Sequence, residues 1–175
     1  MFLTPGRRHE RQTLGGERGQ SLVEFALLLP FLFLVILGMV DAAKAFNYWN
    51  DETHLANEAA RYAAVNHSPV TGQSIEQAIK AQADTVELRN GGGSIAGTGV
   101  TVTFCFPAGE SGQVGQSLKV TVTATYKWFN YLGRPIVQQD IVAHSSMRVE
   151  KAYDNTPPYS TNAYMNTPAG PNTCS

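Results

Sequence analysis

Residues 19–40 read GQSLVEFALLLPFLFLVILGMV, and this stretch decides how the rest of the chain is organised. Sixteen residues from Phe25 to Val40 pass without a charge. Extended back to Gln20, the run has about twenty residues, which as a helix would just span a hydrocarbon core of about 30 Å. We therefore expect residues 20–40 to form a transmembrane helix.

The segment that precedes this run is basic and broken by glycine. The first nineteen residues of the chain contain four arginines, Pro5 and several glycines. Such a leader is typical of a targeting or anchoring segment rather than of part of the fold. Positive charge on this side of the span predicts that the N-terminus lies in the cytoplasm and that residues after Val40 lie on the other side.

The helix is expected to continue past the membrane, to about Asn66, because residues 41–66 contain no Gly and no Pro and are rich in alanine. His67-Ser68-Pro69 would end it. One face carries residues spaced by three and four, namely Ala42, Phe46, Trp49, Thr53, Ala56, Ala60 and Ala63. This stripe predicts packing against the chain's own domain, against other subunits, or against both.

The remaining sequence predicts a small domain of class α+β. A second helix is expected over residues 74–89, where Ser74 and Gln77 fit a capping box and Ile75, Ile79, Ala83 and Val86 form an apolar face. Strands are expected at 100–106, 118–126 and 141–149, from their alternating β-branched residues, and should form a small antiparallel sheet. The exported domain would cover residues 41–153, and residues 154–175 would form an irregular tail rich in Pro, Asn and Thr.

The residues that could carry chemistry do not form a recognisable set. The chain has a net charge of -1 and no basic stripe, so we do not expect it to bind nucleic acid. Its four histidines are scattered, and it has no nucleophile, phosphate-binding or zinc motif. The sequence therefore predicts a protein that is not an enzyme and that holds neither a metal nor a cofactor.

The two cysteines, Cys105 and Cys174, both lie on the side that is expected to be exported. Outside the cytosol, such a pair indicates a disulfide. The bond would tie the tail to the first strand. Two unpaired thiols are the alternative.

Glu24 is the one acidic residue in the predicted transmembrane helix, residues 20–40, and it lies close to the beginning of that helix. A charge at the bilayer centre costs on the order of 2.5 kcal/mol or more, so an intramembrane carboxylate is a functional candidate. The alternative is that Glu24 lies at the interface, where its side chain reaches water.

The run Arg18-Gly-Gln-Ser-Leu-Val-Glu-Phe-Ala-Leu-Leu-Leu-Pro30 resembles the N-terminus of type IV prepilins, and in particular of TadE-like pseudopilins of the tight-adherence (Flp) pilus system. The resemblance covers about residues 17–64, including the stretch Glu58-Ala-Ala-Arg-Tyr-Ala-Ala64. It implies that an inner-membrane prepilin peptidase cuts the leader, residues 1–19, between Gly19 and Gln20. Glu24 would then be the fifth residue of the mature chain and the aromatic Phe25 the sixth, and Glu24 could pair with the new amine.

The same resemblance implies a structural role in the inner membrane or in an extracellular pilus filament. The partners would be the prepilin peptidase, other pilin or pseudopilin subunits and the pilus assembly platform. The chain is much longer than the major Flp pilin, which favours a minor subunit, and a main filament subunit stays open. Gly38 and the alanines would let helices approach closely, and Pro30 could kink the helix.

A different interpretation treats the apolar run as a conventional signal peptide. Ala43-Lys44-Ala45 provides a small-residue cleavage site, so the mature protein could begin at Phe46. An uncut single-pass anchor is the related alternative. Both leave Glu24 without a role.

Overall fold

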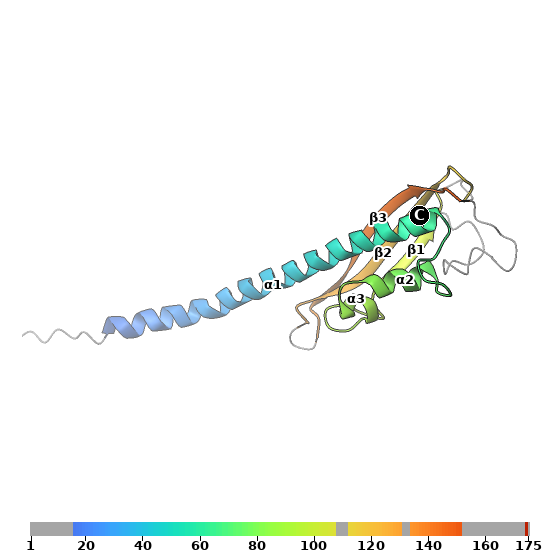
Figure 1. The fold of residues 1–175 in the computed structure, drawn as a ribbon. Coiled ribbons are helices and arrows are strands. Elements are labelled where there is room, and N and C mark those ends of the chain that lie inside the picture. Colours follow the sequence, from blue (N-terminus) through green and yellow to red (C-terminus); the bar gives the residue numbers. More distant parts are fainter. Residues whose placement is uncertain (1–15, 108–111, 131–133, 152–173, 175) are drawn as a thin grey trace, which may run out of the picture. The chain divides into compact units, whose positions relative to one another are not determined.

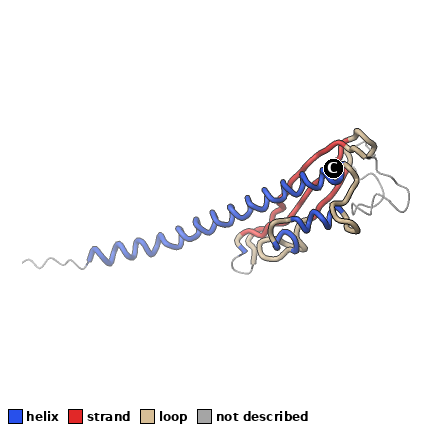
Figure 2. Tube along the Cα trace, in the orientation of Figure 1, coloured by secondary structure: helices blue, strands red, loops and turns tan. Residues whose placement is uncertain are grey.

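The computed structural model describes residues 16–107, 112–130, 134–151 and 174. Among these residues the helices precede the strands in the chain, and Figures 1 and 2 show how they are arranged. They are α1 (Gly16–Ala64), α2 (Ile75–Gln82), α3 (Val86–Asn90), β1 (Thr101–Cys105), β2 (Ser117–Trp128) and β3 (Val137–Arg148). The predicted class, α+β with a long first helix and a small antiparallel sheet, is confirmed. The chain divides into two compact units, Met1–Met39 and Val40–Ser175.

Helix α1 begins four residues before the predicted start at Gln20 and continues through Pro30. Its end differs in cause from the prediction. Asn66 adopts a left-handed conformation (φ 47°), and the amides of Asn66 and His67 donate to the carbonyls of Ala63 and Tyr62. This is a Schellman arrangement, in which asparagine replaces the usual glycine. The helix therefore ends at Ala64 by its own cap, before Pro69 can act.

In its first turns, the face of α1 that packs on the domain is rotated by one residue from the predicted stripe. Ala42, Phe46 and Trp49 are exposed, whereas Asp41, Ala45, Tyr48 and Glu52, again spaced by three and four, are buried. Further along the helix the predicted Ala56, Ala60 and Ala63 are buried, together with Leu55 and Ala59. The prediction was wrong in the first turns because two acidic residues lie on the buried face. A prediction that places only apolar residues on the buried face assigns such acidic residues to the solvent-exposed face.

The predicted second helix is two helices. Ser74 forms the expected capping box with Gln77, but α2 ends at Gln82, and Ala83 is extended (ψ 136°). Thr85 then caps α3 by accepting a hydrogen bond from the amide of Leu88. This break turns Val86 outward, where it is 61% exposed, and places Leu88 in the core in its stead.

The sheet has the order β1-β2-β3, with both pairs antiparallel. Val102 lies opposite Val122 in the first pair, and Val122 lies opposite Ala143 in the second. β2 alternates buried and half-buried residues along most of its length, as its threonine and valine pattern predicts. β2 and β3 are each longer than predicted and extend to Trp128 and Val137 at their shared turn.

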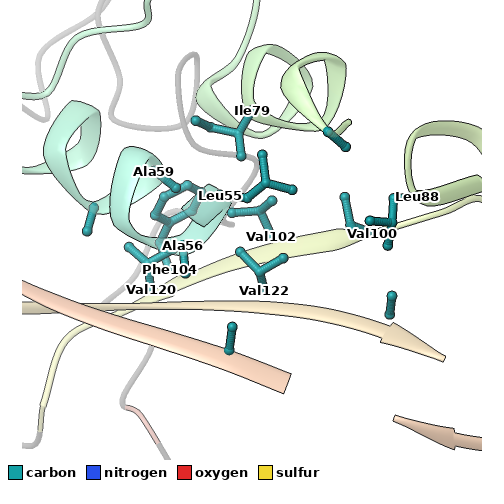
Figure 3. Close-up of a cluster of buried hydrophobic side chains, with 14 of the residues drawn as sticks. Leu55, Ala56, Ala59, Ile79, Leu88, Val100, Val102, Phe104, Val120 and Val122 are labelled. Carbon is teal, nitrogen blue, oxygen red and sulfur yellow. The ribbon is translucent and has the colours of Figure 1, made fainter. Parts of the chain in front are cut away.

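The core lies between the sheet and the helices (Figure 3). Leu55, Ala56 and Ala59 of α1 meet valines of β1 and β2, and Ile79 of α2 and Leu88 of α3 complete the cluster. Gly91, at the end of α3, has φ 76°, and a Cβ there would overlap the carbonyl of Gly97, so the turn before β1 requires glycine.

The leader and tail lie largely outside the described residues. Of the predicted leader, the structure describes only residues 16–19, and of the predicted tail only Cys174.

Candidate functional site

The large apolar side chains of residues 22–40 are exposed in the chain. From Leu22 to Val40 fourteen of them are between 41% and 74% accessible. Among the described residues, α1 is the one helix long and apolar enough to cross a membrane, as judged by length and composition. Water is a poor solvent for such a surface, whereas lipid or other apolar helices would satisfy it.

The predicted processing residues are adjacent in the chain, at the beginning of this segment. Gly19 and Gln20 are both helical and exposed. The side-chain amide of Gln20 donates a hydrogen bond to Glu24 Oε1 (3.2 Å). Phe25 is 58% exposed. The chain thus brings Gln20 and Glu24 together by helical spacing alone, one turn apart.

The two predicted packing residues, Pro30 and Gly38, lie within α1. Pro30 is exposed and Gly38 is half-buried. The helix is assigned without interruption across both positions.

Asp41 is the first residue after the apolar run, and it joins α1 to the sheet. Its carboxylate accepts a hydrogen bond from the Tyr126 hydroxyl (2.7 Å) and another from the Phe129 amide (2.7 Å). Asp41 is only 2% exposed, and Tyr126 is fully buried. Burial, followed by the adjacent Asp41 carboxylate, raises the pKa of Tyr126, so its hydroxyl keeps its proton and remains the donor.

A second polar contact lies two turns further along α1. The Tyr48 hydroxyl donates to Glu87 Oε2 (2.7 Å), which also accepts from the Ser94 amide (2.9 Å). Burial acts against the charge of Glu87, but the hydrogen bonds from Tyr48 and Ser94 outweigh it and lower its pKa. Lys44 donates to Ser94 Oγ (3.0 Å). Together with Asp41, these contacts hold the turns of α1 that follow the apolar run against the turn after α3 and the end of β2.

Glu52 is the least expected residue of the buried face. Its side chain is 0% exposed, and neither carboxylate oxygen has a hydrogen-bond partner. Burial, with smaller effects of Asp51 and Asp140, raises the pKa of Glu52 to about 9. The group is therefore a neutral carboxylic acid at physiological pH.

Neighbouring Asp51 has a structural partner. It accepts a hydrogen bond from the Asp84 amide (2.9 Å), which stabilises the break between α2 and α3. Burial raises the pKa of Asp51. Asp51 and Asp84 line a shallow polar groove together with His54 and the asparagines of α1. Among the described contacts there, no nucleophile lies within hydrogen-bond distance of a base.

Cys105 and Cys174 are joined in a disulfide, with their Cα atoms 5.1 Å apart. The amide of Cys174 also donates to the carbonyl of Phe106 (3.0 Å). Residue 174 is thereby fixed beside the end of β1. Within the described part of the chain, no group of three or more His, Cys, Asp or Glu is arranged to hold a metal ion.

Sequence reasoning predicted the cysteine pair but missed Asp41 and Glu52, and the roles of Gln20 and Glu24 stay predictions. The available signal was spacing. Asp41, Ala45, Tyr48 and Glu52 follow the same three-and-four pattern as the buried alanines beyond them. Allowing polar residues on that stripe would have identified both.

Comparison with known proteins gives one match. Residues 19–61 match the family described as TadE-like protein. The matched segment contains Gln20, Glu24 and the Asp41 contact, and it ends shortly before the end of α1. No curated protein and no solved structure matches the chain significantly.

Proposed function

Since residues 19–61 match the TadE-like protein family, we propose that the chain is a pseudopilin, a membrane-anchored structural subunit of a tight-adherence pilus. One observation carries the proposal. The family match falls on the segment of α1 whose apolar side chains are exposed and on the helical turns that hold the sheet. A single helix thus belongs to both the bilayer and the exported domain.

The proposed life of the chain has two stages. In the membrane, lipid surrounds residues 20–40, with the N-terminus in the cytoplasm and the domain outside. A prepilin peptidase cuts after Gly19, which removes the arginines of the leader and creates an amine at Gln20. In an assembly, neighbouring helices replace the lipid, and Gly38 and the exposed alanines of α1 allow close approach.

The partners that follow from this role are the peptidase, other pilin or pseudopilin subunits and the pilus assembly platform. No catalytic role is proposed for the chain. Asp41 holds α1 to the sheet, and Tyr48 and Asp51 hold α1 to α3 and to the break before it. The size of the domain favours a minor subunit.

The structure weighs against a signal peptide that is cut after Ala45. Such a cut would remove Asp41 and Lys44, and the buried donors of Tyr126 and Phe129 would lose their acceptor. A buried donor left without a partner costs about 1–3 kcal/mol. Ala45 itself is 8% exposed and packs in the core.

Glu24 provides the functional test in cells that make the pilus. Glu24→Gln preserves size and hydrogen bonding but removes the charge that would pair with the mature amine. Breaking a shielded ion pair costs roughly 3–5 kcal/mol, whereas an exposed one contributes about 0–1 kcal/mol. We therefore expect a sharp loss of the chain from isolated pilus machinery, with cleavage after Gly19 followed separately by mass.

Glu150→Gln, a change at an exposed acid outside the matched segment, is the control and should assemble normally. A Glu24→Gln chain that is cut and incorporated at the wild-type level would show that Glu24 is only an interfacial carboxylate. Normal pili in cells without the chain would contradict the pseudopilin role itself.

A further inference from the structure

The contacts of α1 fix the direction in which the sheet runs along it. Asp41 contacts Tyr126 and Phe129 near the end of β2. Further along the helix, the side chain of Asn57 accepts from Ser145 of β3, and the carbonyl of Ala64 accepts from the amide of residue 150. β3 therefore runs in the same direction as α1. The turn between β2 and β3 consequently lies beside Asp41, where the part of α1 that packs on the sheet begins.

This turn, taken here as the described residues 127–130 and 134–137, is apolar and basic. Ile136 is 74% exposed and Val137 is 52% exposed, and Val137 lies opposite Trp128 in the strand pairing. Arg134 is exposed, and Lys127 is half-buried. The described turn at the other end of β2 differs, because residues 112–116 read GQVGQ and carry a single large apolar side chain, Val114.

The turn is held in place rather than covered. The Trp128 ring meets the buried Tyr126 ring edge to face, with centroids 5.0 Å apart. Phe129 has φ 56°, a conformation that costs on the order of 1–3 kcal/mol for such a residue, and its amide is bound to Asp41. The amide of Ile136 donates to the carbonyl of Trp128 (3.1 Å) and closes the turn. These contacts fix the backbone and leave Ile136 and Val137 toward solvent.

We propose that the β2–β3 turn lies in the membrane–water interface and forms a second membrane contact beside the span, an inference that rests on the anchor proposed above. Asp41, which holds the turn, is one residue from Val40, the last residue of the apolar run. The interfacial layer is about 5–7 Å deep on each side of the bilayer, and strands rise about 3.3 Å per residue. Residues 136 and 137 are thus within reach of it.

The side chains of the turn suit this layer. Tryptophan is enriched where one end of a ring can be apolar and the other wet, and exposed isoleucine and valine gain from leaving water. Arg134 and Lys127 provide cations at the same end, and cations are attracted to anionic headgroups. The contact would orient the domain on the membrane before assembly, and extraction of the helix would break it.

Site-specific labels on the full-length chain test this placement. Ile136→Cys, Val114→Cys and Leu28→Cys each add one thiol, while the Cys105–Cys174 disulfide stays oxidised. Each variant carries an environment-sensitive fluorophore and is reconstituted into vesicles of phosphatidylcholine and phosphatidylglycerol with nitroxide lipids. We expect several-fold stronger quenching at 136 than at 114 by a nitroxide near the headgroup, and quenching at 28 by a nitroxide deep in the acyl chain.

A further variant, Val137→Asp in the Ile136→Cys chain, should reduce the quenching without shifting the unfolding midpoint, because Val137 is exposed. Quenching at 28 with none beyond the 114 level at 136 would overturn the interfacial contact and leave the anchor intact. Absence of quenching at 28 would overturn the anchor and the contact together. A label at 136 that is shielded only at high protein density, without nitroxide quenching, would indicate contact with a second copy and would also overturn the proposal.

Discussion

Glu52 shows at the scale of one residue how the fold tolerates a group that it does not satisfy. The carboxyl is fully buried and has no hydrogen-bond partner. It avoids the cost of a buried charge by keeping its proton, because burial raises its pKa to about 9. The unfolded chain would instead titrate near the ordinary value of 4.5. At a pH between 4.5 and about 9, folding therefore requires the uptake of a proton by Glu52.

This linkage predicts that the contribution of Glu52 to stability falls as pH rises. It is fully present below about pH 4.5 and is lost as pH approaches 9, with a slope of at most about 1.4 kcal/mol per pH unit. Glu52→Gln removes the titration. We expect it to flatten the pH dependence between pH 5 and 8 and to stabilise the fold at pH 8 by at least about 1 kcal/mol. Urea unfolding of the full chain in detergent measures both effects.

Glu150→Gln is the matched control, since this acid is exposed and should leave the pH slope unchanged. If Glu52→Gln keeps the wild-type slope, or destabilises the fold at pH 8, then the buried acid is ionised and has a partner within the fold.

At the scale of the element, α1 contains leucines in two different surroundings. Leu55 is 0% exposed in the core, whereas Leu27 is 74% exposed in the apolar segment. Truncating a buried leucine costs about 2–5 kcal/mol through lost burial and the cavity that remains. We expect Leu55→Ala to lower the free energy of unfolding of the domain that follows the apolar run by that amount, and Leu27→Ala to leave it within about 0.5 kcal/mol. Denaturation followed by near-UV circular dichroism reads the domain alone, and equal losses would contradict the separate roles.

Periodicity in the sequence was sufficient for the strands and the long helix, but not for the break between α2 and α3 or for all of the buried faces. The strands, the long helix and the Ser74–Gln77 cap follow from local patterns, and the structure confirms them. The buried face of the first turns of α1 was missed because the predicted stripe admitted no acidic residue, although Asp41 and Glu52 have the required spacing. The partners of Asp41, which are Tyr126 and Phe129, lie 85 and 88 residues away and could not be identified from a local window.

The break between α2 and α3 has a similar cause. The Asp84 amide is satisfied by Asp51 of α1, a contact 33 residues back in the chain. Of the candidate site, the spacing of Gln20 and Glu24 was predictable because both lie on one helix. The Asp41 contact was not, since it needs the register of the sheet along α1.

At the scale of the whole molecule, the disulfide connects the end of β1 to residue 174. The cysteines are 69 residues apart, and closing such a loop stabilises the fold by about 4 kcal/mol in the chain-entropy model. We expect the Cys105→Ser, Cys174→Ser double variant to lose stability of this order. The oxidised protein should give no signal when thiols are labelled under denaturing, non-reducing conditions. Two reactive thiols per chain would show that the tail is not tethered.

As a pseudopilin, the chain would lose its leader by a cut after Gly19. Intact-mass measurement and N-terminal sequencing of the protein from its native membrane test this most directly. For a pseudopilin we expect a mature chain that begins at Gln20 and that keeps Asp41 and its contact with the sheet. A mature chain that begins at Phe46 would indicate a signal peptide, and one that retains Met1 would indicate a plain anchor. Either result would contradict the account.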